Sequence, residues 1–154
     1  APIDAMRVRY WDRAATPGSG CYTAGVLMAR DRFGIFYVEH VIRGQWGPLE
    51  RDRVIEQIAE RDARLYRNEV LIYVEQEGGS GGKEVAGQMI SNLSGFPVFR
   101  DVVSGTKFKT TGGEKLPGEA KIVRAMPLAA QVEAGNVRVV RGPWNNDYIE
   151  ELCA

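Results

Sequence analysis

The sequence predicts a mixed α/β domain, in which three antiparallel strands precede parallel strands and helices cover both faces of the sheet. Three observations support this class. Apolar and polar residues alternate with the period of β-strands near the N-terminus, apolar residues recur every three to four positions in later segments, and stretches rich in glycine and proline separate the segments. With 154 residues and 44% hydrophobic content, the chain has the size of one domain with a substantial core.

The first three predicted strands form an antiparallel meander. The first spans residues 6–15 and delivers Asp12 toward its C-terminal end, and a stretch rich in glycine, serine and proline then ends it. Residues 21–30 and 34–42 are rich in β-forming residues, and the sequence Asp-Arg-Phe-Gly between them predicts a hairpin loop.

Helices and strands alternate in the rest of the chain. Pro48 predicts the start of a helix to about Tyr66, and its charged residues are expected to face solvent. Residues 69–75 are almost continuously apolar and end in Glu75, as is typical of a central strand. The remaining expected elements are a helix from Ser80 or Gly81 to about Leu93, a strand at 96–103, an irregular stretch at 104–118, a helix at 119–134, a strand at 137–140 and a helix after 143–147. This order is that of the ribonuclease H-like fold.

The helix at 119–134 is predicted to have an apolar inward face. Pro127 should kink or restart this helix, because proline removes a backbone hydrogen bond, and Gly135 is suited to end it. The residues expected to face inward are Ile122, Val123, Met126, Ala129, Ala130 and Val132.

Charge and cysteine content exclude several classes of protein. The chain has 20 basic and 20 acidic residues, so no overall positive field predicts nucleic-acid or membrane binding, and any DNA contact must be local. Cys21 and Cys153 lack the spacing of a zinc site or a disulfide framework. No apolar run approaches the ~20 residues of a membrane span. We therefore expect a soluble, cytoplasmic protein.

Two predicted strands end in carboxylates. If these strands are neighbours, Asp12 and Glu75 face each other at the sheet edge where open α/β sheets place their ligands. Carboxylate oxygens suit hard divalent cations, and Mg²⁺ keeps several waters, so a few acidic residues suffice. The simpler alternatives are that Asp12 is a turn residue and Glu75 a solvated strand end. On the pattern alone, a metal site at this edge and these simpler alternatives both stay open.

Four stretches together form a specific combination of motifs. They are Arg-Tyr-Trp-Asp-Arg-Ala-Ala-Thr at 9–16, Val-Glu-Gln-Glu-Gly-Gly-Ser-Gly-Gly-Lys at 74–83, Lys-Ile-Val-Arg-Ala-Met-Pro-Leu at the start of 121–137, and the segment from Trp144 to Leu152. This combination resembles the C-terminal nuclease domain of the large terminase subunit of tailed bacteriophages, the motor protein of DNA packaging. The first two stretches are similar to that family's first two acidic motifs.

The resemblance implies a metal-dependent endonuclease that cleaves concatemeric double-stranded DNA during genome packaging by a phage or prophage. It implies two Mg²⁺ or Mn²⁺ ions bound by Asp12 and Glu75, which would act as the catalytic residues. It also implies an N-terminal ATPase domain in the full protein, a small terminase subunit and a portal as partners, and a location in the cytoplasm of the bacterial host.

The chain departs from the family pattern at its end. The family supplies its third acidic ligand from a His-Asp-Asp-like motif, which would follow Ala154. Residues 1–154 are therefore expected to be one nuclease domain, cut from a longer protein before its last acidic motif, with weak or no activity alone. Asp147 is the only nearby substitute, and it is better explained as a helix N-cap.

Basic residues near the predicted site are candidates for DNA-backbone contact. Lys83 follows a glycine-rich turn that lacks the phosphate-loop pattern, because Glu77 and Glu84 occupy two of its positions. The turn offers helix N-terminal amides to a phosphate, or is simply a flexible connection. The other candidates gather around the irregular stretch, which is otherwise a solvated loop; they are Lys107, Lys109, Lys121 and Arg124.

Two other functions stay open. One is a non-catalytic DNA-binding or docking module of the packaging motor, and the other is a different ribonuclease H-like nuclease, such as a junction resolvase. The Lys-x-x-Arg-Ala-x-Pro-Leu helix argues against the resolvase. His40 is expected to be a surface histidine at a strand end, and Trp11, Trp46 and Trp144 are expected to be packing residues.

Overall fold

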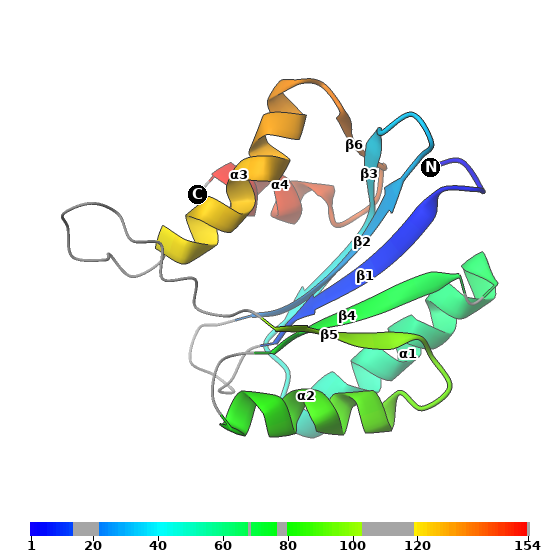
Figure 1. The fold of residues 1–154 in the computed structure, drawn as a ribbon, viewed down its shortest axis with the longest axis vertical. Helices are drawn as coiled ribbons and strands as arrows, with labels where there is room; N and C mark the ends of the chain where they lie inside the picture. The colour runs from blue at the N-terminus through cyan, green and yellow to red at the C-terminus, as the bar shows by residue number, and fades with distance from the viewer. Residues whose placement is uncertain (14–21, 68, 77–79, 103–118, 154) are drawn as a thin grey trace.

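A computed structural model of the chain describes residues 1–13, 22–67, 69–76, 80–102 and 119–153. Within these residues, one six-stranded sheet has the strand order β5-β4-β1-β2-β3-β6. Helices α1 and α2 cover one face of the sheet, and α3 and α4 lie on the other (Figure 1). The elements are β1 (Met6–Asp12), β2 (Thr23–Arg30), β3 (Phe36–Gly44), α1 (Pro48–Tyr66), β4 (Val70–Gln76), α2 (Ser80–Asn92), β5 (Val98–Val102), α3 (Glu119–Glu133), β6 (Val137–Val139) and α4 (Asn145–Cys153).

The strand directions confirm the predicted mixed sheet. Strand β2 pairs antiparallel with both β1 and β3. The other three pairs are parallel: β4 with β1, β5 with β4, and β6 with β3. The parallel connections require helices as crossovers, which α1 and α2 supply on the same face. This is the ribonuclease H-like architecture expected from the order of elements. The irregular stretch predicted at 104–118 lies outside the described residues.

The hairpin between β2 and β3 has the local chemistry that its sequence predicts. One carboxylate oxygen of Asp31 accepts hydrogen bonds from the backbone N–H groups of Phe33 and Ile35, both at 2.9 Å. Gly34 has a φ of +85°, a left-handed conformation that glycine adopts without steric cost. The other Asp31 oxygen accepts a hydrogen bond from the Tyr37 hydroxyl at 3.1 Å. The aspartate therefore organises the whole turn.

The main core lies between the sheet and the α1–α2 layer. Trp11 is 1% exposed and Val74 is fully buried on this face of the sheet, and both pack with apolar residues of the two helices. The other members of the cluster are Ile55, Ile58, Ala59, Ile72, Met89 and Leu93. The expected packing roles of Trp11 and Met89 are confirmed. Because residues in a strand alternate between faces, the neighbours Asp12 and Glu75 belong to the opposite face.

A buried ion pair interrupts the predicted charged face of α1. Asp62 is 1% exposed, so the expectation that the charged residues of this helix face solvent is wrong at this position. The Arg9 guanidinium on β1 is also fully buried and donates to both carboxylate oxygens of Asp62, at 2.8 and 3.0 Å. The helical pattern places Asp62 on the helix but does not reveal a cation on the facing strand. The pair explains why a charge is tolerated in the core.

Helix α3 differs from its predicted packing. Met126 is 61% and Val132 56% exposed, and Ala129 and Ala130 are also exposed, so the expected inward orientation of these residues is wrong. The helix also continues through Pro127 instead of restarting there. Gly135 ends the helix as predicted, with a φ of +74°, and the backbone N–H of Asn136 donates to the Gln131 carbonyl at 2.9 Å. The spacing of apolar residues predicted the helix correctly, but it did not predict which of its side chains are exposed.

In the part of the chain that the structure describes, no helix is both long and apolar enough to span a membrane.

Candidate functional site

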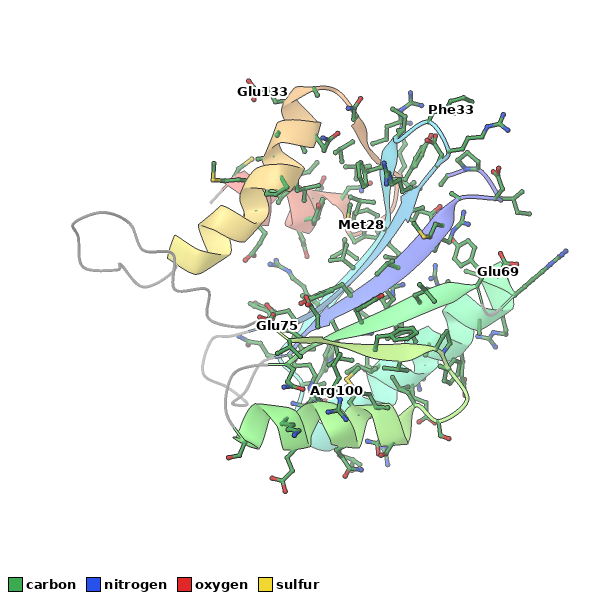
Figure 2. All side chains as sticks on the ribbon, in the orientation of Figure 1. Met28, Phe33, Glu69, Glu75, Arg100 and Glu133 are labelled. Atoms are coloured by element: carbon green, nitrogen blue, oxygen red, sulfur yellow. The ribbon has the colours of Figure 1, made fainter. Side chains whose placement is uncertain are left out.

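Asp12 and Glu75 lie at the ends of neighbouring parallel strands. The last paired residues of β1 and β4 are Trp11 and Val74, and the two acids follow them directly. Adjacent strands are about 4.8 Å apart, so the backbones that carry these acids are neighbours on one edge and one face of the sheet. Figure 2 shows Glu75 at the C-terminal end of β4. Asp12 is exposed and Glu75 is half-buried. The structure thus brings these two predicted residues together, and their role as metal ligands stays a prediction.

A third acid, which the sequence did not single out, lies on the same row. Asp101 on β5 is the register partner of Glu75, so Asp12, Glu75 and Asp101 occupy three successive strands at one level. Arg100, the preceding residue, points toward α2 (Figure 2), which puts Asp101 on the other face with Glu75. The Tyr10 hydroxyl donates a hydrogen bond to Asp101 Oδ2 at 2.9 Å. The sequence around Asp101 has no pattern that predicts a functional role, because the acid lies in a short strand at the edge of the sheet. Only the order of the strands places Asp101 beside Glu75.

Arg13 attaches the end of β1 to helix α2. One guanidinium nitrogen lies 3.2 Å from the backbone carbonyl of Val85 and 3.6 Å from the Met89 sulfur. Burial lowers the pKa of Arg13, the nearby Arg51 cation lowers it further, and Asp52 opposes both. Because Arg13 directly follows Asp12, this contact restrains the strand end that carries the candidate ligand.

A cavity of about 710 Å³ opens beside Asp12, between the sheet and α4. Arg43 on β3 lines it and bridges to α4, through an ion pair with Asp147 at 3.8 Å and a shorter one with Glu151. The Arg43 guanidinium stacks on the Tyr22 ring, with its Cζ atom 4.9 Å from the ring centroid. The remaining lining residues are Ala24, Val26, Val41, Ile42, Pro143, Trp144 and Tyr148. The cavity therefore combines an apolar floor with charged residues at Asp12 and on α4.

Asp147 does not have its predicted role. Helix α4 begins at Asn145, so Asp147 lies in the first turn and is not the N-cap. An acid in the first turn still interacts favourably with the helix dipole. Asp147 lines the same cavity as Asp12, but its carboxylate is paired with Arg43. The Asp147 side chain is 68% exposed, and one of its oxygens faces Arg43.

The donor chemistry at the strand ends suits a hydrated divalent cation. Asp12 and Glu75 supply only carboxylate oxygens, which hard cations prefer, and such cations retain several waters when protein ligands are few. Across the described ranges, no group of three or more histidine, cysteine, aspartate or glutamate side chains is placed to hold a metal ion. Within the described residues, the two carboxylates at the strand ends are therefore the oxygen donors that the prediction assigns to the metal.

The structure describes only some of the predicted DNA-contacting side chains. Lys83 lies near the start of α2, which begins at Ser80, and its side chain is exposed. Lys107 and Lys109 lie outside the described residues, as does Glu77. Lys121 and Arg124 lie on α3, with side chains outside the described part. The basic residues thus remain candidates from the sequence.

His40 lies within β3, so the prediction that it sits at a strand end is wrong. It is half-buried, and its Nδ1 is 3.3 Å from the Arg9 guanidinium. Burial and the neighbouring Arg9 and Arg61 cations lower the pKa of His40 to about 4, against the opposing effect of Asp62. The neutral imidazole therefore belongs to the buried network around Arg9 and not to the candidate site.

Comparison with known proteins identifies a family for this chain. The model of a family described as the terminase RNaseH-like domain matches residues 9–154, which include both candidate ligands and almost the whole chain. No curated protein matches the chain. The matched range covers the C-terminal part of the strand that carries Asp12, the strand that carries Glu75 and all four helices of the described residues. The chain therefore belongs to the family of terminase RNaseH-like domains.

Proposed function

We propose that this domain is the metal-dependent endonuclease of a phage or prophage large terminase, which cleaves concatemeric double-stranded DNA during genome packaging. One observation carries the proposal. Asp12 and Glu75 follow the last paired residues of two adjacent parallel strands, on one face of a terminase RNaseH-like domain. Acids at this edge of an open sheet lie where such folds bind their ligands.

The reaction would be the hydrolysis of a phosphodiester bond. Two Mg²⁺ or Mn²⁺ ions, when bound, would lower the pKa of an attacking water and neutralise charge on the phosphate. Asp12 and Glu75 would supply oxygen ligands from neighbouring strands. The family pattern has a third acidic ligand, and we propose that another part of the full-length protein supplies it.

The remaining residues would hold the duplex and the site. Lys83, Lys107, Lys109, Lys121 and Arg124 are proposed to contact backbone phosphates, which bind cationic side chains without regard to sequence. Arg13 would restrain the strand end next to Asp12 through its contacts with α2. An ATPase domain, the small terminase subunit and the portal are proposed partners of the full-length protein.

The test is cleavage of supercoiled plasmid by the full-length protein in Mn²⁺. The wild-type protein should produce nicked and linear DNA, and a chelator should abolish both products. Asp12→Asn and Glu75→Gln should each reduce the rate by at least about a hundredfold, because both remove a ligand charge while keeping the side-chain shape. Asp4→Asn and Glu56→Gln are matched controls at exposed positions outside the strand ends. Wild-type cleavage by the Asp12→Asn protein would refute the assignment.

The alternative is a non-catalytic DNA-binding or docking module of the packaging motor. It would be favoured if the full-length protein lacked a third acidic ligand. The same assay separates the two functions. Duplex binding by the full-length protein, with no cleavage in either Mg²⁺ or Mn²⁺, would support the binding module and contradict the nuclease.

A further inference from the structure

We propose that the hydrogen bond between Tyr10 and Asp101 is a positioning bridge for Glu75, an inference that rests on the proposed function. Tyr10 lies on β1 and Asp101 on β5, and β4 separates these strands in the sheet. The two side chains, joined by the 2.9 Å hydrogen bond from the Tyr10 hydroxyl to Asp101 Oδ2, therefore cross two strand spacings, about 10 Å of sheet. The bridge must pass over β4, the strand that carries Glu75.

The sheet register shows where the bridge crosses β4. Tyr10 is level with Tyr73, whereas Asp101 is level with Glu75. The phenol side chain thus runs diagonally, from the level of Tyr73 toward the level of Glu75. Tyr73 also stacks on Phe99, with ring centroids 5.4 Å apart and an interplanar angle of 29°. Aromatic rings therefore fill this face on the side of Glu75 away from the strand end.

This arrangement limits the positions that the Glu75 side chain can adopt. The rings of Tyr10 and Tyr73 lie behind it, and Asp101 lies beside it on β5. On its other side, Asp12 lies level with Glu75 at the end of β1. These neighbours favour positions of the Glu75 carboxylate toward Asp12 and the C-terminal edge of the sheet. Restricting a side chain before binding lowers the entropic cost of binding, so the bridge should raise the affinity for the cation.

Asp101 acts through Tyr10 in this account and is not itself a ligand. Its Oδ2 accepts the Tyr10 hydrogen bond, which holds the carboxylate in line with the phenol. Three substitutions separate the two roles. Tyr10→Phe removes only the hydroxyl, Asp101→Ala removes the acceptor, and Asp101→Asn removes the charge but keeps an oxygen that can accept the bond.

The experiment measures Mn²⁺ binding to the full-length protein by the electron paramagnetic resonance signal of free Mn²⁺. Tyr10→Phe and Asp101→Ala should each weaken binding on the order of tenfold, as is typical for partners that orient a metal ligand. Asp101→Asn should recover most of the affinity that Asp101→Ala loses. Plasmid cleavage should require correspondingly more Mn²⁺ in the two weakened variants.

Tyr37→Phe is the matched control. It removes a second tyrosine–aspartate hydrogen bond, the one to Asp31 in the hairpin between β2 and β3, and should leave Mn²⁺ affinity unchanged. Wild-type Mn²⁺ affinity in Tyr10→Phe would overturn the proposal. So would an Asp101→Asn variant as weak as Asp101→Ala, because the charge and not the bridge would then matter.

The failure of this proposal is distinguishable from the failure of the nuclease function. If Asp12→Asn abolishes cleavage while Tyr10→Phe leaves both Mn²⁺ binding and cleavage unchanged, only the positioning bridge is wrong. If the wild-type protein neither binds Mn²⁺ nor cleaves DNA, the nuclease function and the bridge are both wrong.

Discussion

Arg9 and Asp62 form a two-point ion pair in the interior of the domain. The guanidinium Nε lies 2.8 Å from one carboxylate oxygen and Nη2 lies 3.0 Å from the other, with both side chains almost completely shielded from solvent. Arg9 also donates to the backbone carbonyl of Gly25 at 3.3 Å. The pair therefore joins the first strand, which carries Asp12, to helix α1 and to the neighbouring strand β2.

Removing one partner of this pair should be costly. Asp62→Ala leaves the Arg9 cation buried without its counter-charge, and we expect it to lower the free energy of unfolding by about 3–5 kcal/mol. Urea unfolding followed by circular dichroism measures the change. Asp52→Ala is the matched control on the same helix, because its partner Arg51 is adjacent and the pair is more exposed. A loss below about 1 kcal/mol in Asp62→Ala would contradict the energetic role given to the pair.

The protein should lose stability as the pH falls from about 6.5 toward 4. His40 has a pKa of about 4 in the folded protein, against a usual value of 6.5, so the unfolded chain binds its proton first. The neutral imidazole makes its full contribution to the free energy of unfolding above pH 6.5, and this contribution is lost as the pH falls from 6.5 to 4. Allowing for the half-exposed ring, we expect a loss of about 2 kcal/mol between pH 7 and pH 4.5.

His40 is the only histidine of the sequence, which makes the control simple. His40→Gln supplies an amide oxygen to Arg9 and cannot titrate, so its unfolding free energy should vary much less between pH 7 and 4.5. The lowered pKa values of Asp31 and Glu39 come from hydrogen bonds and ion pairs that overcome burial, and they affect stability only at lower pH. An unchanged pH profile in His40→Gln would show that another group titrates in this window.

Gly25 should not tolerate a side chain. A Cβ atom at this position would lie 2.5 Å from Cζ3 of the Trp11 ring, a distance that forces the buried indole to move. We expect Gly25→Ala to lower the free energy of unfolding by about 1–3 kcal/mol, which is typical of overpacking in a core. Gly81→Ala on helix α2 meets no atom within 4 Å and should be neutral or slightly stabilising. Equal stability of the two variants would mean that the indole moves at no cost.

Lys107 and Lys109 should contribute to duplex binding by neutralising backbone phosphates. Replacing Lys107 and Lys109 together by alanine should reduce the slope of log affinity against log salt concentration by about 2, because each neutralised phosphate contributes roughly one to that slope. Fluorescence anisotropy of a labelled duplex with the full-length protein, across a salt series, measures the slope. Arg64→Ala, at an exposed position in the last turn of α1, is the control and should leave the slope unchanged.

Local patterns in the sequence predict most of the helices and strands. Proline at the first position of a helix and a continuous apolar stripe defined α1 from Pro48 to Tyr66, and both bounds are confirmed. The strands that carry Asp12 and Glu75 were also recognisable, because alternation and an apolar run are short-range signals. Such signals arise from residues a few positions apart, so the sequence reveals them without knowledge of the partners.

Other features depended on which strands became neighbours. The pairing of β1 with β4 brought Asp12 beside Glu75, and the pairing of β4 with β5 added Asp101 to the same row. The burial of Asp62 and the exposure of Met126 likewise depended on what lay opposite each helix. Sheet order and helix packing result from contacts between residues distant in the chain, and many arrangements share the same local pattern. The folded structure alone selects one of them, and with it the neighbours of every residue at the candidate site.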